Sequence, residues 1–184
     1  PVGDTDEARC AVFYSITNCQ DGLRGISFGN FLIKQVAMEL QRELPQLRGF
    51  ATLSPLPGFR QWLERQRVAG IEALAQRGWQ QAKESDALPV LLQQLCAYYL
   101  LHAKQGRQPL DPVARFHLGN GARLERINWL GDTSDNGIAR SAGLMVNYVY
   151  RLDEVERNHE LFMNDNRVIA SREVEHLARE CPLS

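Results

Sequence analysis

The sequence predicts a mixed α/β domain, and three observations carry this prediction. Residues 9–17 are rich in β-branched and aromatic side chains, which is typical of a strand. Residues 30–44 place apolar side chains at helical spacing, and residues 50–53 form a short apolar run. A strand, a helix and a second strand in this order imply a parallel pair joined by a right-handed crossover. The 184 residues, 44% of them hydrophobic, are enough for one domain with a substantial core.

A loop and a helix follow the first predicted strand. Residues 18–29 contain three glycines and are expected to form the loop. The helix over 30–44 is supported by an apolar stripe at Phe31, Leu32, Ile33, Val36, Ala37, Leu40 and Leu44. Pro45 and Gly49 mark the end of this helix, because both residue types interrupt regular structure.

The second predicted strand leads into a long helical segment. This strand is expected to stop at residues 54–58, because the prolines there cannot donate to a central ladder. Residues 59–106 have a helical composition, with breaks at Gly70 and near Pro89. The strongest helical pattern within them covers residues 88–104.

A β-hairpin is predicted in the second half of the chain. Residues 113–118 and 123–129 are expected to be its strands, and an Asn-Gly turn signal lies between them at 119–121. The other elements expected are a turn over 108–112, a strand or the start of a helix over 144–151, and helices near 153–163 and 171–180.

The charge and cysteine content exclude several classes of protein. The formal net charge of −1 gives no global attraction to nucleic acid or to an anionic membrane. No apolar run approaches the roughly 20 residues of a membrane span, and no signal-peptide pattern opens the chain, so an intracellular protein is expected. The four cysteines have neither CxxC nor zinc-ligand spacing, so no metal site is expected and free thiols are favoured over disulfides. They are Cys10, Cys19, Cys96 and Cys181.

The glycine-rich segment 22–29 is the first candidate binding site. It lies between a predicted strand and a predicted helix, where glycines allow the backbone to approach a ligand closely. The N–H groups and positive dipole end of the following helix could then bind a pyrophosphate. Glycine spacing alone leaves an ordinary turn between strand and helix equally open.

Several blocks of the sequence resemble the malonyl-CoA decarboxylase family. They occur in the family's order and cover residues 11 to about 150. The blocks are Phe13-Tyr14-Ser15-Ile16, Gly22-Leu23-Arg24-Gly25, Gly29-Asn30-Phe31-Leu32-Ile33-Lys34, Leu53-Ser54-Pro55-Leu56-Pro57-Gly58-Phe59, Phe116-His117-Leu118-Gly119-Asn120-Gly121-Ala122, Arg126-Ile127-Asn128-Trp129 and Gly143-Leu144-Met145-Val146-Asn147-Tyr148. Agreement of separate blocks in register is more specific than any single one.

The resemblance implies a fold and a reaction. It implies an α/β (α+β) fold like that of the GCN5-related acetyltransferases, with a mixed sheet flanked by helices and a helical insertion at about 59–106. Residues 1–184 would be an acyl-CoA-binding catalytic domain whose first strands, with a helical domain, are expected upstream. The family converts malonyl-CoA to acetyl-CoA and carbon dioxide in fatty acid metabolism, without metal or organic cofactor. A homo-oligomer formed through the helical domain stays open, as do cytoplasmic, mitochondrial and peroxisomal locations.

The resemblance also implies which residues bind coenzyme A. These are Arg24, Gly25, Ile26, Ser27, Phe28, Gly29 and Asn30. The planar guanidinium of Arg24 suits a phosphate. Lys34 lies further along the predicted helix, where a solvated position is at least as well supported.

Three residues are candidates for the chemistry. Ser54 follows a strand and could donate to a carboxylate, although a serine before proline often only ends a strand. His117 could move a proton near neutral pH, although a histidine in an apolar segment is more often a core residue. Tyr150 could donate as a neutral phenol or simply fill the core. The resemblance favours the catalytic reading of Ser54 and His117. It makes Tyr150 a third catalytic candidate, for which a core position stays equally open, and it suggests Asn128 and Asn147 as supporting residues. Three further histidines are expected to face solvent: His102, His159 and His176.

Three functions are therefore compared. The first is decarboxylation of malonyl-CoA, which the pairing of Ser54 with His117 favours. The second is a CoA-dependent acyltransferase, which would need an acceptor and a base for it. The third is a CoA-binding domain without turnover. Incubation with malonyl-CoA alone separates them, because only a decarboxylase needs no acceptor.

Overall fold

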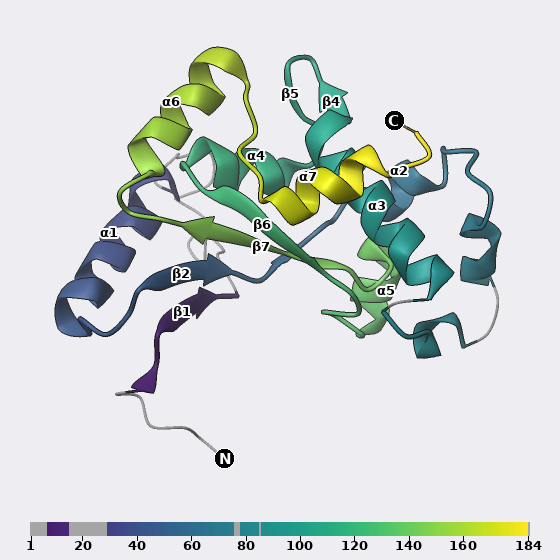
Figure 1. Ribbon diagram of the computed structural model, residues 1–184, viewed down its shortest axis with the longest axis horizontal. Helices are drawn as coiled ribbons and strands as arrows, with labels where there is room; N and C mark the ends of the chain where they lie inside the picture. Colours follow the sequence, from purple (N-terminus) through teal and green to yellow (C-terminus); the bar gives the residue numbers. More distant parts are fainter. Residues whose placement is uncertain (1–6, 15–28, 76–77, 85, 184) are drawn as a thin grey trace, which may run out of the picture.

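A five-stranded mixed sheet forms the centre of the computed structural model, which describes residues 7–14, 29–75, 78–84 and 86–183 (Figure 1). The strands of this sheet are β1 (Cys10–Phe13), β2 (Gly49–Thr52), β3 (Ser54–Pro55), β6 (Arg123–Asn128) and β7 (Met145–Tyr150). A separate two-stranded hairpin consists of β4 (Lys104–Gln105) and β5 (Gln108–Pro109). Helices flank the sheet, as the sequence predicts.

The helices differ in length and regularity. The α-helices are α1 (Gly29–Glu43), α2 (Phe59–Leu63), α3 (Ala87–His102), α4 (Pro112–Gly119), α5 (Asp135–Ser141), α6 (Val155–Asp165) and α7 (Arg172–Arg179). Two short 3₁₀ helices, η3 (Ile71–Ala75) and η4 (Trp79–Gln81), lie between α2 and α3. None of the helices in the described ranges is long and apolar enough to cross a bilayer.

The parallel pair predicted at the start of the chain is confirmed. Strands β1 and β2 are parallel neighbours, with Cys10 opposite Gly49 and Phe13 opposite Thr52, and α1 connects them. Strand β7 continues the sheet as an antiparallel partner of β2, β3 and β6. The segment 144–151, for which strand and helix were both open, therefore forms the strand that organises the sheet.

The predicted strand stop at residues 54–58 is right about where the strand ends but wrong about its first two residues, which still pair as β3 (Ser54–Pro55). The β2–β7 ladder ends where Ala51 pairs with Val149, and β3 resumes pairing with the same strand through Ser54 and Val146. Pro55 is compatible with this position because, of the strands that the structure describes, β3 pairs with β7 alone, so the missing N–H removes no second ladder. β2 and β3 therefore follow one another along β7, with a short break in backbone pairing just before Ser54.

The predicted hairpin over 113–129 is also wrong in its first half. Residues 113–118 belong to helix α4, because Asp111 accepts a hydrogen bond from the N–H of Ala114 at 2.8 Å and Pro112 opens the helix. Gly121 then turns the chain into β6 with φ of 79°. A Cβ at Gly121 would lie 2.1 Å from the carbonyl oxygen of Val155, so this turn accepts only glycine.

The middle of the chain is less helical than its composition suggests. Among the residues that the structure describes between 59 and 106, those of α2 and α3 are α-helical, and the two 3₁₀ segments lie between them. The expected turn over 108–112 contains strand β5 and the cap of α4 instead. Helix α3 is buried on most sides and contributes Leu92, Leu95 and Leu100 to the core.

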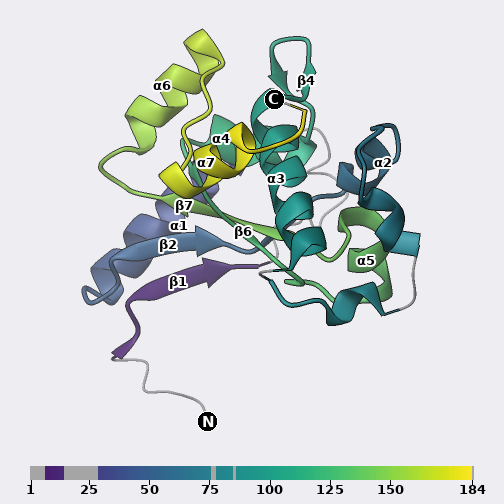
Figure 2. The same ribbon diagram turned by 45° about the vertical axis from the view of Figure 1, so that its right-hand side comes forward.

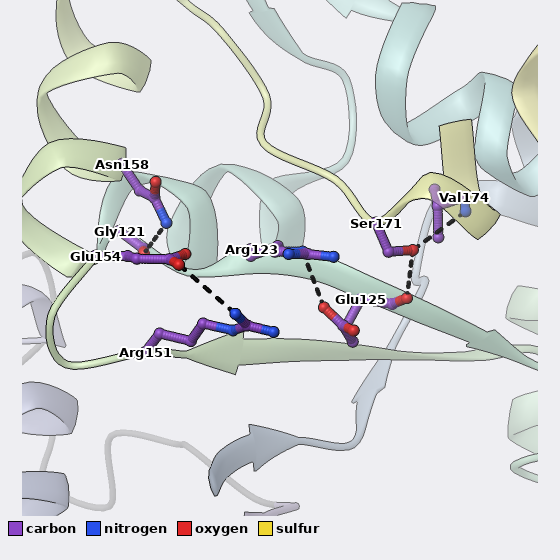
Figure 3. Close-up of polar contacts among 8 residues, drawn as sticks. All are labelled: Gly121, Arg123, Glu125, Arg151, Glu154, Asn158, Ser171 and Val174. Carbon is purple, nitrogen blue, oxygen red and sulfur yellow. Dashed lines mark hydrogen bonds and ion pairs between the residues drawn. The ribbon is translucent and has the colours of Figure 1, made fainter. Parts of the chain in front are cut away.

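The last two helices, both predicted, are tied to the sheet region by side-chain hydrogen bonds (Figure 3). Ser171 accepts from the N–H of Val174 at 3.2 Å and donates to the carbonyl oxygen of Glu125 at 2.7 Å. Asn158 of α6 donates to the carbonyl oxygen of Gly121 at 3.3 Å. Helix α7 consequently lies alongside α3 and β6, which Figures 1 and 2 both show.

Side chains alternate between a buried and a more open face of β2 and β7. The buried side chains are Thr52 at the end of β2, Ser54 on β3, and Val146, Tyr148 and Tyr150 on β7. The residues between them on β7 are only partly buried. Two hydroxyl groups therefore lie on the same covered face as two tyrosine rings.

Candidate active site

Ser54 and His117 meet in the interior although 63 positions separate them. The Oγ atom of Ser54 on β3 lies 3.0 Å from Nε2 of His117 on α4. Only 4% of Ser54 and 3% of His117 is exposed. The expectation that His117 would lie on a strand is wrong, since the cap at Asp111 makes its segment helical, but the helix still places the ring beside Ser54.

The imidazole of His117 has two further neighbours, both from β7. Its Nδ1 atom lies 2.8 Å from the hydroxyl of Tyr150. The ring of Tyr148 stacks on it with centroids 4.6 Å apart and an angle of 23° between the planes. Position and orientation of the imidazole are therefore fixed by two hydrogen bonds and one stacked ring.

Burial determines the protonation state of His117. Removal of the ring from water lowers its pKa from 6.5 to about 4, because the charged form loses its hydration. Near neutral pH the ring is therefore neutral, with one nitrogen that donates and one that accepts. Burial also raises the pKa of the Tyr150 hydroxyl, so this phenol is a neutral donor or acceptor.

Thr52 adds a fourth member to the hydrogen-bonded set of Ser54, His117 and Tyr150. Its Oγ1 atom lies 2.8 Å from Oγ of Ser54 and accepts the N–H of Tyr148 at 3.2 Å. We call the connected groups of Thr52, Ser54, His117 and Tyr150 the hydroxyl–imidazole relay. Sequence analysis did not single out Thr52, although two-residue strand periodicity places it on the same face as Ser54.

Asn147, predicted to support the site, contacts Thr52, and Asn128 is connected to the site through Asn147. Nδ2 of Asn128 donates to Oδ1 of Asn147 at 2.8 Å. Nδ2 of Asn147 donates in turn to the carbonyl oxygen of Thr52 at 2.6 Å. Side chains thus replace backbone pairing at the gap in the ladder, where Asn147 and Tyr148 both hold Thr52.

A buried carboxyl anchors the helix that carries His117. Asp111 is fully buried, and the hydroxyl of Tyr99 donates to it at 3.4 Å in addition to the bond from Ala114. Burial raises the pKa of this carboxyl, while the bond from the helix N–H acts in the opposite direction. Asp111 was not predicted, although an aspartate before proline is a typical start of a helix.

The predicted coenzyme A loop lies mostly outside the described residues. This applies to Arg24, Gly25, Ile26, Ser27 and Phe28. Gly29 and Asn30 begin helix α1, whose first residue directly follows that loop. Lys34 forms an ion pair with Glu156 of α6 at 2.7 Å.

The remaining histidines and cysteines have settings distinct from the relay. His102, His159 and His176 are exposed, which confirms the expectation. Among the cysteines that the structure describes, Cys10, Cys96 and Cys181 are free thiols. Within the same residues, no group of three His, Cys, Asp or Glu side chains could hold a metal ion.

Fold and site together define an α/β domain with a buried relay of hydroxyl and imidazole groups. Such a relay can donate hydrogen bonds to an oxyanion and can transfer a proton. The family model described as malonyl-CoA decarboxylase C-terminal domain matches residues 2–182. The chain belongs to this family, which confirms the resemblance found in the sequence.

Individual relatives agree with the family. The mitochondrial malonyl-CoA decarboxylase of Anser anser anser is 40% identical over 202 residues, which cover 93% of this chain and 40% of the relative. The mouse protein of the same name is 37% identical over 208 residues, covering 95% of this chain and 42% of the relative. The chain thus spans about two fifths of the length of these curated relatives.

Solved structures of malonyl-CoA decarboxylases share the fold of this chain. The malonyl-CoA decarboxylase of Rhodopseudomonas palustris is 50% identical with a TM-score of 0.86, and the match covers 94% of this chain and 43% of that one. The protein of Agrobacterium vitis is 47% identical with a TM-score of 0.86, and the match covers 95% and 46%. These structures confirm the mixed sheet flanked by helices.

Proposed function

We propose that this chain provides the site at which malonyl-CoA loses carbon dioxide and becomes acetyl-CoA. One observation carries the proposal: the buried hydrogen-bonded set of Ser54, His117 and Tyr150 occurs in a member of the malonyl-CoA decarboxylase family. Ser54 and His117 come from segments far apart in the sequence, and each is almost fully removed from solvent.

The proposed reaction breaks the bond between the malonyl carboxylate carbon and the methylene carbon. Its electron pair moves into the thioester and gives an enolate, carbon dioxide leaves, and a proton then adds to the methylene carbon. Hydrogen bonds to the departing carboxylate and to the enolate oxygen are the contributions that a protein can make. One preorganised donor of this kind is worth about 3–4 kcal/mol in the transition state.

In this proposal, Ser54 and His117 position the carboxylate, stabilise the enolate and supply the proton. Because the pKa of His117 is lowered to about 4, its ring works as a neutral donor and acceptor and not as a permanent cation. Tyr150 is the third member, and its neutral phenol orients the imidazole through the bond to Nδ1. The proton that is consumed in the reaction is replaced from solvent. The mechanism needs no acyl-enzyme, metal or organic cofactor, because the thioester itself takes up the electron pair.

Coenzyme A is proposed to bind through residues 24–30. The start of α1 at Gly29 supports this, because the free N–H groups of a helix N-terminus favour phosphate. Gly25 and Gly29 would allow the phosphates to approach the backbone, and Arg24 would add a charged partner.

The test is incubation of the protein with malonyl-CoA and no acceptor. Release of carbon dioxide together with an equal amount of acetyl-CoA is expected. Ser54→Ala should lower kcat by roughly 10²–10³ with little effect on coenzyme A binding, because coenzyme A lacks the carboxylate. Ser141→Ala is the matched control, since Ser141 is also buried but lies on α5.

Other outcomes would replace the proposal. Turnover that appears only when an amine or thiol acceptor is added would indicate an acyltransferase. Binding of coenzyme A without turnover in either assay would indicate a binding domain. A Ser54→Ala variant with unchanged kcat and only a higher KM would remove Ser54 from the chemical step.

A further inference from the structure

The direction of the hydrogen bonds in the hydroxyl–imidazole relay can be worked out by counting protons. Thr52, Ser54 and Tyr150 each carry one O–H, and neutral His117 carries one ring N–H, so four protons are available. Three hydrogen bonds connect these groups: Thr52 with Ser54, Ser54 with His117, and His117 with Tyr150. In the first of them either hydroxyl can donate to the other across 2.8 Å, so donation from Ser54 to Thr52 and donation from Thr52 to Ser54 have to be compared. One donor is therefore left without an acceptor inside the relay.

His117 cannot be the group with the unused proton. Both of its nitrogens take part in relay bonds, Nε2 with Ser54 and Nδ1 with Tyr150. A neutral ring has one donating and one accepting nitrogen, and each of these bonds uses one of them. The unused proton therefore belongs to Thr52, Ser54 or Tyr150.

Position in the sheet, together with burial, distinguishes these three hydroxyl groups. All three residues are buried, and Ser54, at 4%, keeps slightly more exposed surface than Thr52 at 0% and Tyr150 at 1%. Ser54 also borders the gap in the ladder along β7, because its pair with Val146 is the first one after the last pair of β2. A buried donor without an acceptor is strongly disfavoured, whereas a donor that a ligand can reach is not.

We propose that the relay converges on Ser54, with Thr52 and Nε2–H of His117 both donating to its Oγ atom, so that the Ser54 O–H is the one donor left for the substrate. An oxygen of this kind has two lone pairs and can accept both bonds. Nδ1 of His117 then accepts from the Tyr150 O–H, and every other relay proton has a partner. Thr52 is consequently a positioning residue that acts through Ser54.

The surroundings of Thr52 suit this role. Its Oγ1 atom accepts the N–H of Tyr148, and its carbonyl oxygen accepts Nδ2 of Asn147, which Asn128 holds in turn. The amide of Asn147 is thereby oriented by two bonds, with its oxygen toward Asn128 and its nitrogen toward Thr52. The hydroxyl of Thr52 is fixed at a gap in the sheet where an ordinary ladder bond would otherwise form.

The first test measures the tautomer of His117 without substrate, so it does not depend on the proposed decarboxylation. ¹⁵N-labelled histidine distinguishes a protonated from an unprotonated ring nitrogen by NMR near pH 7, and the His117→Asn variant assigns the signal. The expected state is protonated Nε2 and unprotonated Nδ1. A wild-type ring protonated at Nδ1 would overturn the proposal, because Ser54 would then have to donate to Nε2.

Two tyrosine variants sharpen this test. Tyr150→Phe removes the donor to Nδ1 and should shift a measurable fraction of His117 to the other tautomer. Tyr148→Phe is the matched control, because its phenol has no hydrogen-bond partner among the described residues while its ring stacks on the same imidazole. Equal changes of tautomer in the two variants would contradict the assigned bond direction.

The second test concerns Thr52 and rests on the proposed function. Thr52→Val preserves shape but removes the hydroxyl, and it should lower kcat for malonyl-CoA by about 10- to 100-fold with KM nearly unchanged. Thr52→Ser restores a hydroxyl and should recover most of kcat. A Thr52→Val enzyme with wild-type kcat, or a Thr52→Ser enzyme no better than Thr52→Val, would reject the positioning role.

Failures of the two proposals can be told apart. Protonated Nε2 in a wild-type protein that does not turn over malonyl-CoA would support the proposed bond directions in the relay. The same result would contradict the proposed decarboxylase function. If Thr52→Val does not fold, the wild-type tautomer and the kcat of Thr52→Ser still decide the question. A Thr52→Ser variant that folds normally but has lost kcat as far as Ser54→Ala would count against the role of the hydroxyl.

Discussion

The buried, neutral state of His117 predicts a specific pH dependence of stability. The pKa of the folded ring is about 4, whereas that of an exposed histidine is 6.5. Between these values the unfolded chain binds a proton that the folded chain does not. The free energy of unfolding contributed by this residue is therefore fully retained above about pH 6.5 and is lost as the pH falls toward 4.

The size of this effect follows from the two pKa values. Each pH unit between them is worth about 1.4 kcal/mol, so the full difference amounts to about 3 kcal/mol by pH 4. No large discount for solvent screening applies, because the side chain is 3% exposed. Other groups titrate in the same range, so the effect has to be measured as a difference between wild type and a variant that cannot bind the proton.

Urea unfolding of wild type and His117→Asn at several pH values between 4 and 7 measures this difference. Between pH 7 and pH 4, the free energy of unfolding should fall by about 3 kcal/mol more in the wild type than in His117→Asn. This comparison does not depend on how much the substitution itself destabilises the protein at pH 7. His176→Asn is the control, because it makes the same substitution at an exposed histidine on α7 and leaves the buried ring in place. Parallel pH profiles for wild type and His117→Asn would refute the reasoning.

Two further predictions concern the turn after α4 and the start of α7. Gly121→Ala should lower the free energy of unfolding by more than about 2 kcal/mol, because positive φ costs about 1–2 kcal/mol and the new Cβ meets Val155. Gly106→Ala, with φ of 64° and no atom within 4 Å, should show only the conformational cost. Ser171→Ala should lower the free energy of unfolding by about 1–2 kcal/mol. Ser134→Ala, which removes an exposed N-cap, should lower it by less. Urea unfolding measures all four, and equal losses within either pair would contradict the explanation.

The sequence predicted those parts of the fold that local patterns determine. The crossover through α1 was predictable because a helical apolar stripe lies between two segments with strand composition. Helix α4 was mistaken for a strand because residues 113–118 contain apolar and aromatic side chains, and the signal that decides, Asp111 before Pro112, lies just outside them. Helix α5 was missed because it is short and polar, with a serine cap as its only strong local signal.

The site was predicted unevenly, for a physical reason. Ser54, His117 and Tyr150 carry side chains with evident chemistry, and the family resemblance drew attention to them. Thr52 has none of these features, since threonine is an ordinary strand residue. The role proposed for it depends on the gap in the β2–β7 ladder, where residues 96 positions apart come together. No local pattern contains that information.

The same long separations have a consequence for how the protein folds. The bond between Ser54 and His117 closes a loop of 63 residues, and the bond between Thr52 and Tyr148 closes one of 96. Contacts of this kind form slowly, because chain entropy must be lost before they stabilise anything. During synthesis, the relay cannot close until Tyr150 has left the ribosome, so most of the sheet and α4 must wait for β7 before the site exists.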